Sequence, residues 1–560
     1  MKKTRSAIIY PLLCSAVMLP AVMLPAILSP LAFSSAARAA EASDAVEAGS
    51  VEAGAMAQQE TASADSASSA AAVPELILSK CFLLESDNYE SIADGYFQAI
   101  LLAPACAKQY PQLAASLTQL NKEIASSCRE SFKELSDKTR QYLAGTDISD
   151  GAAPSATLES NIVPVRQDEK AVSFFTAAYS HIPGAVSATT TFRGYTLDSA
   201  DGHIVTLEQV LADRENRGAL AAAVSANLRF TGTGVQAGGR DESVSVALAS
   251  EETFPAWVVS NDGVIFRFNP GVIGSEEEGA LEAEVRFSQY PDLFSDAYAA
   301  HKGSYTLPIN TVYPVMADLD GDGTTEKVSL NARPSEDGEK GSYTALRVAL
   351  GDKECLHETY FFNARGVLLH TGAGKNYLYV QSITDNDYRI LSVFDLNGET
   401  PVFKGEINGT GFTARYRRDS SDADLWYLDE QFISSPESFF LDSHMDLMST
   451  YSASRRYKVG DDGMPFALTD VYEIDSDLVL TSLTDLPADI VDADSGDVAK
   501  QSSVLPRGTK CSLYRTNGID SVDVKAEDGT IYRFTVTGDW PQMVNGLRLD
   551  QAFEGTMFAG

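Results

Sequence analysis

The sequence lacks the motifs that identify a familiar catalytic centre. Its 560 residues contain no HExxH, no GxSxG and no P-loop, the patterns typical of zinc proteases, serine hydrolases and nucleotide-binding enzymes. Its six histidines are scattered singly: His181, His203, His301, His357, His370 and His444. A single histidine is more often structural than catalytic, so we expect a protein that is not an enzyme.

Cysteine is also scarce. There are six cysteines and no CxxC pair, which argues against a cysteine-ligated zinc site and against thioredoxin-like chemistry. Five follow Cys14: Cys81, Cys106, Cys128, Cys355 and Cys511. Because five is odd, at least one thiol is unpaired or joins another chain, and a disulfide among the first three stays open in an oxidising compartment.

Positive charge is in short supply. The chain has 43 Lys and Arg against 78 Asp and Glu, for a net charge of −35. A chain this acidic repels nucleic acid and anionic membranes, and it attracts cations and basic proteins. We therefore expect an extracellular protein or a cell-wall ligand as partner, and no nucleic acid. Solubility in an extracellular medium also accounts for the charge.

Long apolar runs occur at the N-terminus alone. A basic start, "MKKTR", precedes an apolar run at residues 7–33 and the small-residue exit Ala37-Arg38-Ala39, which together predict a bacterial signal peptide over residues 1–39. Removing it lowers the net charge from −35 to −39. No later segment has the ~20 apolar residues of a membrane span. The sequence predicts a secreted or cell-envelope protein with no permanent span.

The remaining chain divides by composition. Residues 40–73 are almost wholly Ala, Ser, Glu, Gly and Asp, which predicts a flexible linker. Residues 74–308 predict an α+β domain, a sheet covered by helices. A helix begins at Pro111 and ends near Ala144, with apolar residues every three or four positions. Asn261-Asp262-Gly263 between two β-rich runs predicts a hairpin.

Beyond residue 308 the chain is predicted to be all β. Short apolar runs alternate with Asp, Asn and Gly turns over residues 309–495, which fits a partial propeller or a sandwich. Residues 496–560 have strands joined at Asn517-Gly518 and Asp528-Gly529, and they resemble a small SH3-like β barrel of the kind that serves as a binding or wall-associated module.

One loop has the spacing of a metal site. In "DLDGDGTTE", Asp318, Asp320, Asp322 and Glu326 can converge on one cation, with the carbonyl of Thr324 as a further ligand, because Gly321 and Gly323 let the backbone curl. A set of hard oxygens favours Ca²⁺. An EF-hand needs a glutamate at position twelve, where this chain has Ser329. The loop therefore resembles the shorter calcium loops of integrin-like propeller blades, with a structural ion.

A family resemblance covers about residues 75–300. The segments "FFTAAYSHIPGA", "FRGYTLDSADGHIVTLEQVL", "FPAWVVSNDGVIFRF" and "YPDLF" resemble a secreted bacterial domain family of unknown function that also forms the ectodomains of some membrane anti-sigma factors. Similar residues stand in members of the family at Tyr179, His181, Gly202, Leu207 and the run Gly263–Phe268. The resemblance implies a non-enzymatic ectodomain, which in the anti-sigma branch binds lysozyme. This chain has no cytoplasmic sigma-binding part or clear membrane anchor, which speaks against direct control of transcription.

These features predict an exported, non-enzymatic, multidomain bacterial binding protein, with a basic extracellular protein such as lysozyme as the sharpest hypothesis for its ligand. Two alternatives stay open from the sequence. One is an exported hydrolase whose site is assembled from residues far apart in the chain. The other is a structural protein whose β modules contact the cell wall.

Overall fold

The computed structural model describes residues 73–87, 90–145, 155–183, 185, 188–231, 235–298, 303–311, 314–335, 341–418, 426–493 and 495–558. This part of the chain is mostly β, with 50% strand and 17% helix, and none of its sheets is closed. The predicted signal peptide and nearly all of the predicted linker lie outside it. Within the described residues, no helix is both long enough and apolar enough to cross a bilayer.

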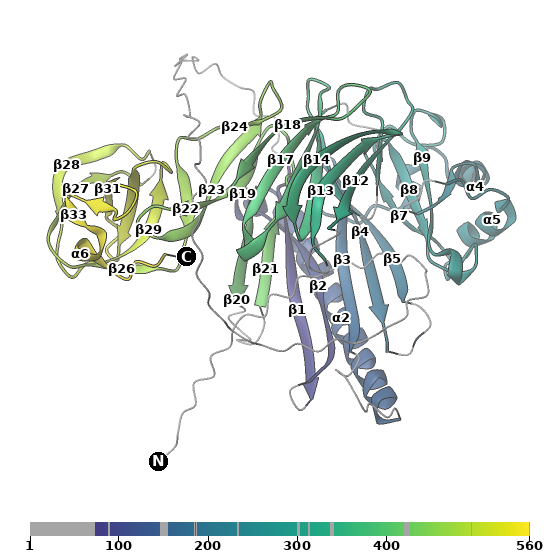
Figure 1. Ribbon diagram of the computed structural model, residues 1–560. Coiled ribbons are helices and arrows are strands. Elements are labelled where there is room, and N and C mark those ends of the chain that lie inside the picture. Colours follow the sequence, from purple (N-terminus) through teal and green to yellow (C-terminus); the bar gives the residue numbers. More distant parts are fainter. Residues whose placement is uncertain are drawn as a thin grey trace.

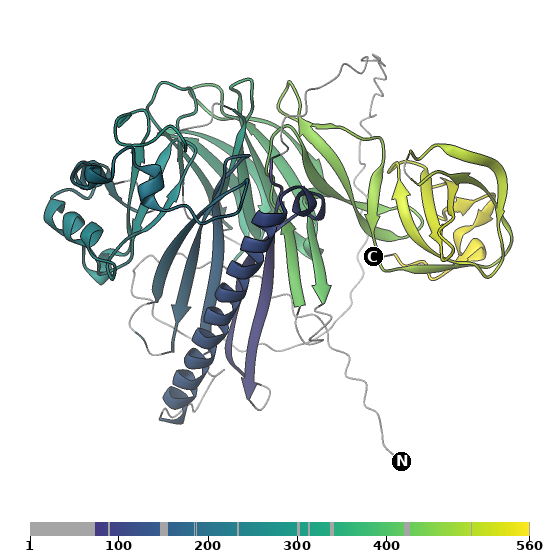
Figure 2. The ribbon, with the colours of Figure 1, turned by 180° about the vertical axis from the view of Figure 1, so that it is seen from behind.

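The first sheet has seven strands in the order β20-β21-β1-β2-β3-β4-β5. The strands are β1 Leu76–Asp87, β2 Glu90–Leu102, β3 Ala156–Gln167, β4 Ala171–His181, β5 Thr189–Asp198, β20 Ala414–Arg418 and β21 Trp426–Gln431. Two helices, α1 Pro104–Gln109 and α2 Pro111–Ala144, connect β2 to β3. Figure 2 shows α2 lying across one face of this sheet, and Figure 1 shows the opposite face.

Helix α2 confirms the predicted helix. Proline is well placed at its first position, where a backbone N–H would have no partner in any case. One side of the helix is buried against the sheet at steps of three or four residues: Leu113, Leu117, Leu120, Ile124, Cys128, Phe132 and Leu135. The amphipathic period of the sequence thus determines which face of α2 covers the sheet.

Strand β21 joins the first sheet from far along the chain. It pairs antiparallel with β1, with Ile77 opposite Gln431 and Cys81 opposite Tyr427. The pairing places a segment of the predicted residue 309–495 domain in one sheet with the predicted residue 74–308 domain. The domain boundaries themselves stay predictions.

A four-stranded sheet and its helices form the next part, seen on the right in Figure 1. Its strand order is β6-β9-β8-β7, and its elements are β6 Leu228–Phe230, β7 Ala256–Val259, β8 Gly263–Phe268, β9 Leu281–Arg286, α3 Leu207–Val210, α4 Arg217–Ala226, α5 Asp241–Ala249, and the 3-10 turns η1 Arg214–Asn216 and η2 Glu276–Glu278. The β7–β8 pairing, with Ala256 opposite Arg267, confirms the predicted hairpin. Leu220, Val224, Val244 and Phe266 share one core between the helices and this sheet.

Two further sheets share a second core. One has the order β10-β15-β16-β17-β18 and the other β11-β12-β13-β14. Their bounds are β10 Tyr305–Asn310, β11 Val315–Ala317, β12 Glu326–Pro334, β13 Tyr343–Leu350, β14 Lys353–Phe361, β15 Asn363–His370, β16 Asn376–Ile383, β17 Arg389–Asp395 and β18 Val402–Asn408, with the turn η3 Asp385–Asp387. Leu330 and Leu346 of one sheet pack in the same core as Leu378 and Phe394 of the other. Two sheets that share one core are compatible with the sandwich alternative, and the choice between a sandwich and a partial propeller stays a prediction.

The last sheet has fourteen strands. They are β19 Thr410–Phe412, β22 Phe439–Asp446, β23 Thr450–Val459, β24 Pro465–Ala467, β25 Tyr472–Asp475, β26 Val479–Ser482, β27 Leu486–Val491, β28 Val498–Leu505, β29 Lys510–Thr516, β30 Ser521–Ala526, β31 Ile531–Thr537, β32 Met543–Val544, β33 Leu547–Arg548 and β34 Phe553–Glu554, with helix α6 Leu549–Ala552. The core around Phe534 and Phe553 also takes in Leu480 and Leu486. The SH3-like barrel of residues 496–560 stays a prediction, because this sheet is not closed.

No disulfide joins the five cysteines of the described chain. Cys128 is buried on the apolar side of α2, as its position in the helical pattern predicts. Cys81, Cys106 and Cys511 are buried as well, whereas Cys355 is half-buried. Burial raises the pKa of the Cys511 thiol to about 12, so this side chain behaves as an unreactive apolar residue.

Candidate metal centre

The predicted calcium loop connects two paired strands. β11 and β12 are antiparallel, with Ala317 opposite Glu326 at the mouth of the loop. Gly321 and Gly323 have φ values of 77° and 88°, a left-handed conformation that costs glycine little and other residues more. The glycines therefore let the loop fold back on itself, as the sequence predicts.

Backbone amides of the loop donate to its carboxylates. Both oxygens of Asp318 accept such bonds, Oδ1 from Gly321 N–H at 2.8 Å and Oδ2 from Gly323 N–H at 2.9 Å. Oε2 of Glu326 accepts from the N–H of Leu319 at 2.8 Å. These bonds orient the carboxylates while leaving each oxygen with further acceptor capacity.

Three of the predicted ligand side chains converge. Asp318, Asp320 and Glu326 each offer an oxygen, and these oxygens lie within 4.8 Å of one another. Burial raises the pKa of Glu326, and the charges of the neighbouring aspartates raise it further. Part of this upward pKa shift thus comes from repulsion among the carboxylates, and a bound cation would relieve that repulsion.

The other two predicted ligands lie outside that triad. Oδ1 of Asp322 accepts a hydrogen bond from the backbone N–H of Thr324 at 2.6 Å. The backbone N–H of Asp322 donates to Oδ1 of Asp320 at 3.1 Å. Asp322 contributes to the local negative charge, since it raises the pKa of Glu326. Coordination by Asp322 and by the carbonyl of Thr324 stays a prediction.

An arginine from another sheet forms two hydrogen bonds with the loop. Arg286, at the end of β9, donates from Nη1 to the carbonyl oxygen of Gly323 and from Nη2 to Oγ1 of Thr325, both at 2.6 Å. From a third sheet, Nδ2 of Asn376 at the start of β16 donates to the carbonyl oxygen of Leu319 at 2.8 Å. The sequence analysis did not find these two residues, because nothing in the local pattern of either one points to the loop.

Two further carboxyl groups lie behind the loop, the half-buried Asp262 and the buried Glu284. Asp262, in the β7–β8 turn, has a pKa raised by burial and next by the charge of Asp318, against the lowering effect of Arg286. Glu284 on β9 is 6% exposed. Burial raises its pKa to about 7, and Arg229 opposes this shift while Asp262 adds to it. The acidic region therefore extends from the loop into the neighbouring sheet.

A tyrosine and a histidine stack beside this acidic region. The rings of Tyr305 and His370 lie 4.6 Å apart and nearly parallel. Nδ1 of His370 is 2.7 Å from Oδ1 of Asn376, the residue that binds the loop backbone. Burial raises the pKa of Tyr305, and so do the charges of Asp262 and Asp318. Tyr305 is thus kept neutral and serves as packing next to the charged groups.

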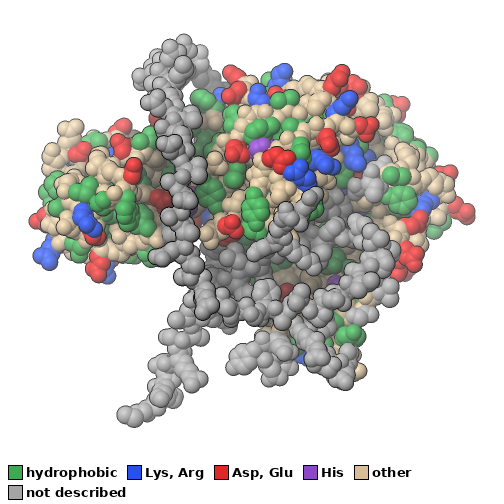
Figure 3. Space-filling view, viewed as in Figure 1, with side chains coloured by type: hydrophobic (Ala, Val, Ile, Leu, Met, Phe, Trp, Pro, Cys, Tyr) green, Lys and Arg blue, Asp and Glu red, His purple; other side chains and the backbone are tan. Residues whose placement is uncertain are grey.

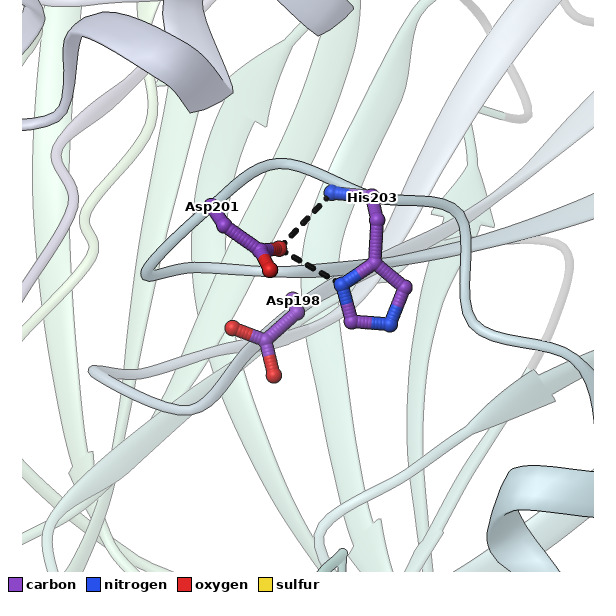
Figure 4. Close-up of side chains that lie close together, drawn as sticks. All are labelled: Asp198, Asp201 and His203. Atoms are coloured by element: carbon purple, nitrogen blue, oxygen red, sulfur yellow. Dashed lines mark hydrogen bonds and ion pairs between the residues drawn. The ribbon is translucent and has the colours of Figure 1, made fainter.

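A second group of metal-ligating side chains lies at the end of β5 (Figure 4). The ligand atoms of Asp198, Asp201 and His203 are within 4.8 Å of one another. Each residue already has a partner, since Oδ2 of Asp198 is 2.7 Å from Nζ of Lys170 and Oδ1 of Asp201 is 2.5 Å from Nδ1 of His203. Nε2 of His203 is 3.2 Å from the side-chain nitrogen of Gln209. We interpret this group as the closure of a turn.

Three of the described histidines are paired with carboxylates. Those that meet a carboxylate do so at the surface or in a half-buried position, in the pairs His203 with Asp201, His357 with Glu406, and His444 with Asp446. Among the hydrogen bonds of the described residues, none joins a histidine to a serine hydroxyl. His181, which the sequence analysis associates with Tyr179, lies at the end of β4 in a half-buried position.

Of the three comparisons with known proteins, the one with solved structures found similar chains. The sequence matches no protein-family model and no curated protein. Similar solved structures include a DUF3298 family member from Bacteroides fragilis, 11% identical with a TM-score of 0.29, over 40% of this chain and 95% of that one. Another is a DUF3298 family protein from Pseudomonas aeruginosa, 12% identical with a TM-score of 0.25, over 41% of this chain and 98% of that one.

DUF3298 is a domain family of unknown function, and neither description names an activity. The anti-sigma, calcium-loop and SH3-like parts of the predicted resemblance stay predictions.

Proposed function

We propose that the chain is an exported, non-enzymatic bacterial binding protein that holds one structural Ca²⁺ in the β11–β12 loop and recognises a basic protein outside the cytoplasm. The observation that carries the metal part is the convergence of Asp318, Asp320 and Glu326 within 4.8 Å. Carboxylate and carbonyl oxygens are the ligands that Ca²⁺ takes, in a geometry that tolerates irregular loops.

The ion has a structural role in this proposal. The loop joins two strands of a sandwich sheet, and its backbone is bonded to Arg286 from the neighbouring sheet. Cancelling the repulsion among the carboxylates would hold the hairpin and this contact together. His370 is stacked on Tyr305 and bonded to Asn376, the residue that donates to the loop backbone at Leu319. In this proposal His370 packs beside the loop and does not activate a bound water.

The proposed partner follows from the charge of the chain. A net charge of −35 favours long-range attraction of basic proteins. On the face shown in Figure 3, acidic and basic side chains are interspersed over the sandwich sheets, with further acidic groups at the end formed by α4 and α5. Specific binding of a basic partner therefore needs local contacts in addition to the long-range attraction of the net charge. Lysozyme is the partner that the family resemblance of the sequence suggests.

A pull-down tests this partner directly. Immobilised chain is expected to retain lysozyme at ~0.15 M salt, where screening over ~8 Å removes most non-specific long-range attraction. Cytochrome c, a basic protein of similar size, serves as the control and is expected to wash through. If both proteins are retained equally or neither is retained, the lysozyme hypothesis is wrong.

A further inference from the structure

An open cavity lies between the helices that pack on the β6-β9-β8-β7 sheet. The calcium loop belongs to a different sheet, β11-β12-β13-β14. Its volume is about 510 Å³. Three segments that are separate in sequence form its walls: the start of α3, the C-terminal end of α5 with the turn that follows it, and Arg217 at the start of α4. The lining residues that matter for binding are Glu208, Arg217, Glu251, Phe254 and Trp257.

The aromatic wall of the cavity is fixed in position. Trp257 and Phe254 pack against the core of this part, and Trp257 belongs to β7. β7 runs so close to β5 that a Cβ atom on Gly194 would lie 2.1 Å from the carbonyl oxygen of Trp257. Glycine at position 194 therefore allows this contact, and the indole is held by the backbone that passes beside it.

The cavity retains one negative charge that the structure does not neutralise. Glu208 and Arg217 form an ion pair at 2.5 Å, so their charges cancel. Glu251 is exposed on the rim, and it has no ion-pair partner among the residues that the structure describes. It lies two residues beyond the end of α5, whose C-terminal end carries partial negative charge from its carbonyl groups. An aromatic wall beside a free carboxylate is the arrangement that attracts an organic cation.

We infer that this cavity binds the cationic side chain of a lysine or arginine presented by a basic protein. The ammonium or guanidinium group would lie against Trp257 and Phe254, with its charge directed to Glu251. A volume of about 510 Å³ exceeds the needs of one such side chain, so neighbouring atoms of the partner also fit. That the side chain comes from a basic protein rests on the proposed function. Binding of a cationic side chain in the cavity is tested separately, with small peptides.

The test uses the full chain with Trp426 and Trp540 replaced by phenylalanine, so that Trp257 is the single fluorescent indole. The peptides acetyl-Gly-Arg-Gly-amide and acetyl-Gly-Lys-Gly-amide are expected to give a saturable change in its emission. The neutral peptide acetyl-Gly-Gln-Gly-amide is expected to give none. Glu251→Gln should weaken binding of the cationic peptides about 5-fold, the size expected when one exposed charge contact is lost.

Glu252→Gln is the matched control, because it removes the same charge at the next residue, which does not line the cavity. It is expected to change the affinity less than ~2-fold. Equal losses in the two variants, or the same response to the neutral peptide, would overturn the inference. If the cationic peptides bind but lysozyme is not retained in the pull-down, the inference about the cavity is supported and the proposed partner is wrong. If lysozyme is retained but the peptides do not bind, the cavity inference is wrong.

Discussion

Saturating calcium is expected to stabilise the metal-free chain by about 2.7 kcal/mol when the free ion reaches ~100 times its dissociation constant. The reason is that the ion binds the folded loop, where Asp318, Asp320 and Glu326 converge, and does not find this arrangement in the unfolded chain. Thermal unfolding after treatment with a chelator, with and without added CaCl₂, measures the gain. Calorimetric titration is expected to show one ion per chain.

Asp320→Ala is expected to remove most of the stabilisation, because it deletes one of the three convergent carboxylates. Asp528→Ala is the matched control. Asp528 also lies in a tight turn between strands and accepts a backbone N–H, that of Thr530 at 2.9 Å, but it is in the last sheet, away from the loop. An equal calcium response in the Asp320 variant and in the wild-type chain would mean that the ion binds elsewhere.

Glu284→Gln is expected to raise the stability of the chain at pH 8 by as much as about 3 kcal/mol and to change it little below pH 4.5. Burial raises the pKa of Glu284 from 4.5 to about 7, so the folded chain holds a proton that the unfolded chain has already lost. The stability from this group is present in full below pH 4.5 and is lost as the pH rises through 7. Glutamine resembles the protonated acid and does not ionise.

Urea unfolding of both chains between pH 4 and pH 8, with a chelator present, measures this difference. Glu282→Gln on the same strand gives the contrast, because Arg267 and Arg229 lower the pKa of Glu282 against the effect of burial. Both arginines bond to its carboxylate at 3.1 Å, so this variant is expected to lose stability at neutral pH. If Glu284→Gln has the same effect at pH 5 and pH 8, Glu284 does not titrate in this range.

The calcium loop shows which parts of the candidate site local sequence can predict. The spacing of its aspartates and glycines predicts a curled loop, and the structure brings Asp318, Asp320 and Glu326 together. The same pattern gives no information about Arg286, which reaches the loop from another sheet. Nor does it show that Asp262 and Glu284 extend the acidic region behind the loop. Side chains that meet across sheets leave no periodic signal along the chain.

The sequence by itself determined the elements whose cause is local. The apolar stripe from Leu113 onward determined the buried face of α2, and the Asn261-Asp262-Gly263 turn determined the β7–β8 hairpin. Tertiary structure alone decided that β21 pairs with β1 and that Trp257 and Glu251 line one cavity. Local patterns fix helices and turns because neighbours in sequence interact, whereas pairing between distant strands depends on how the whole chain closes its core.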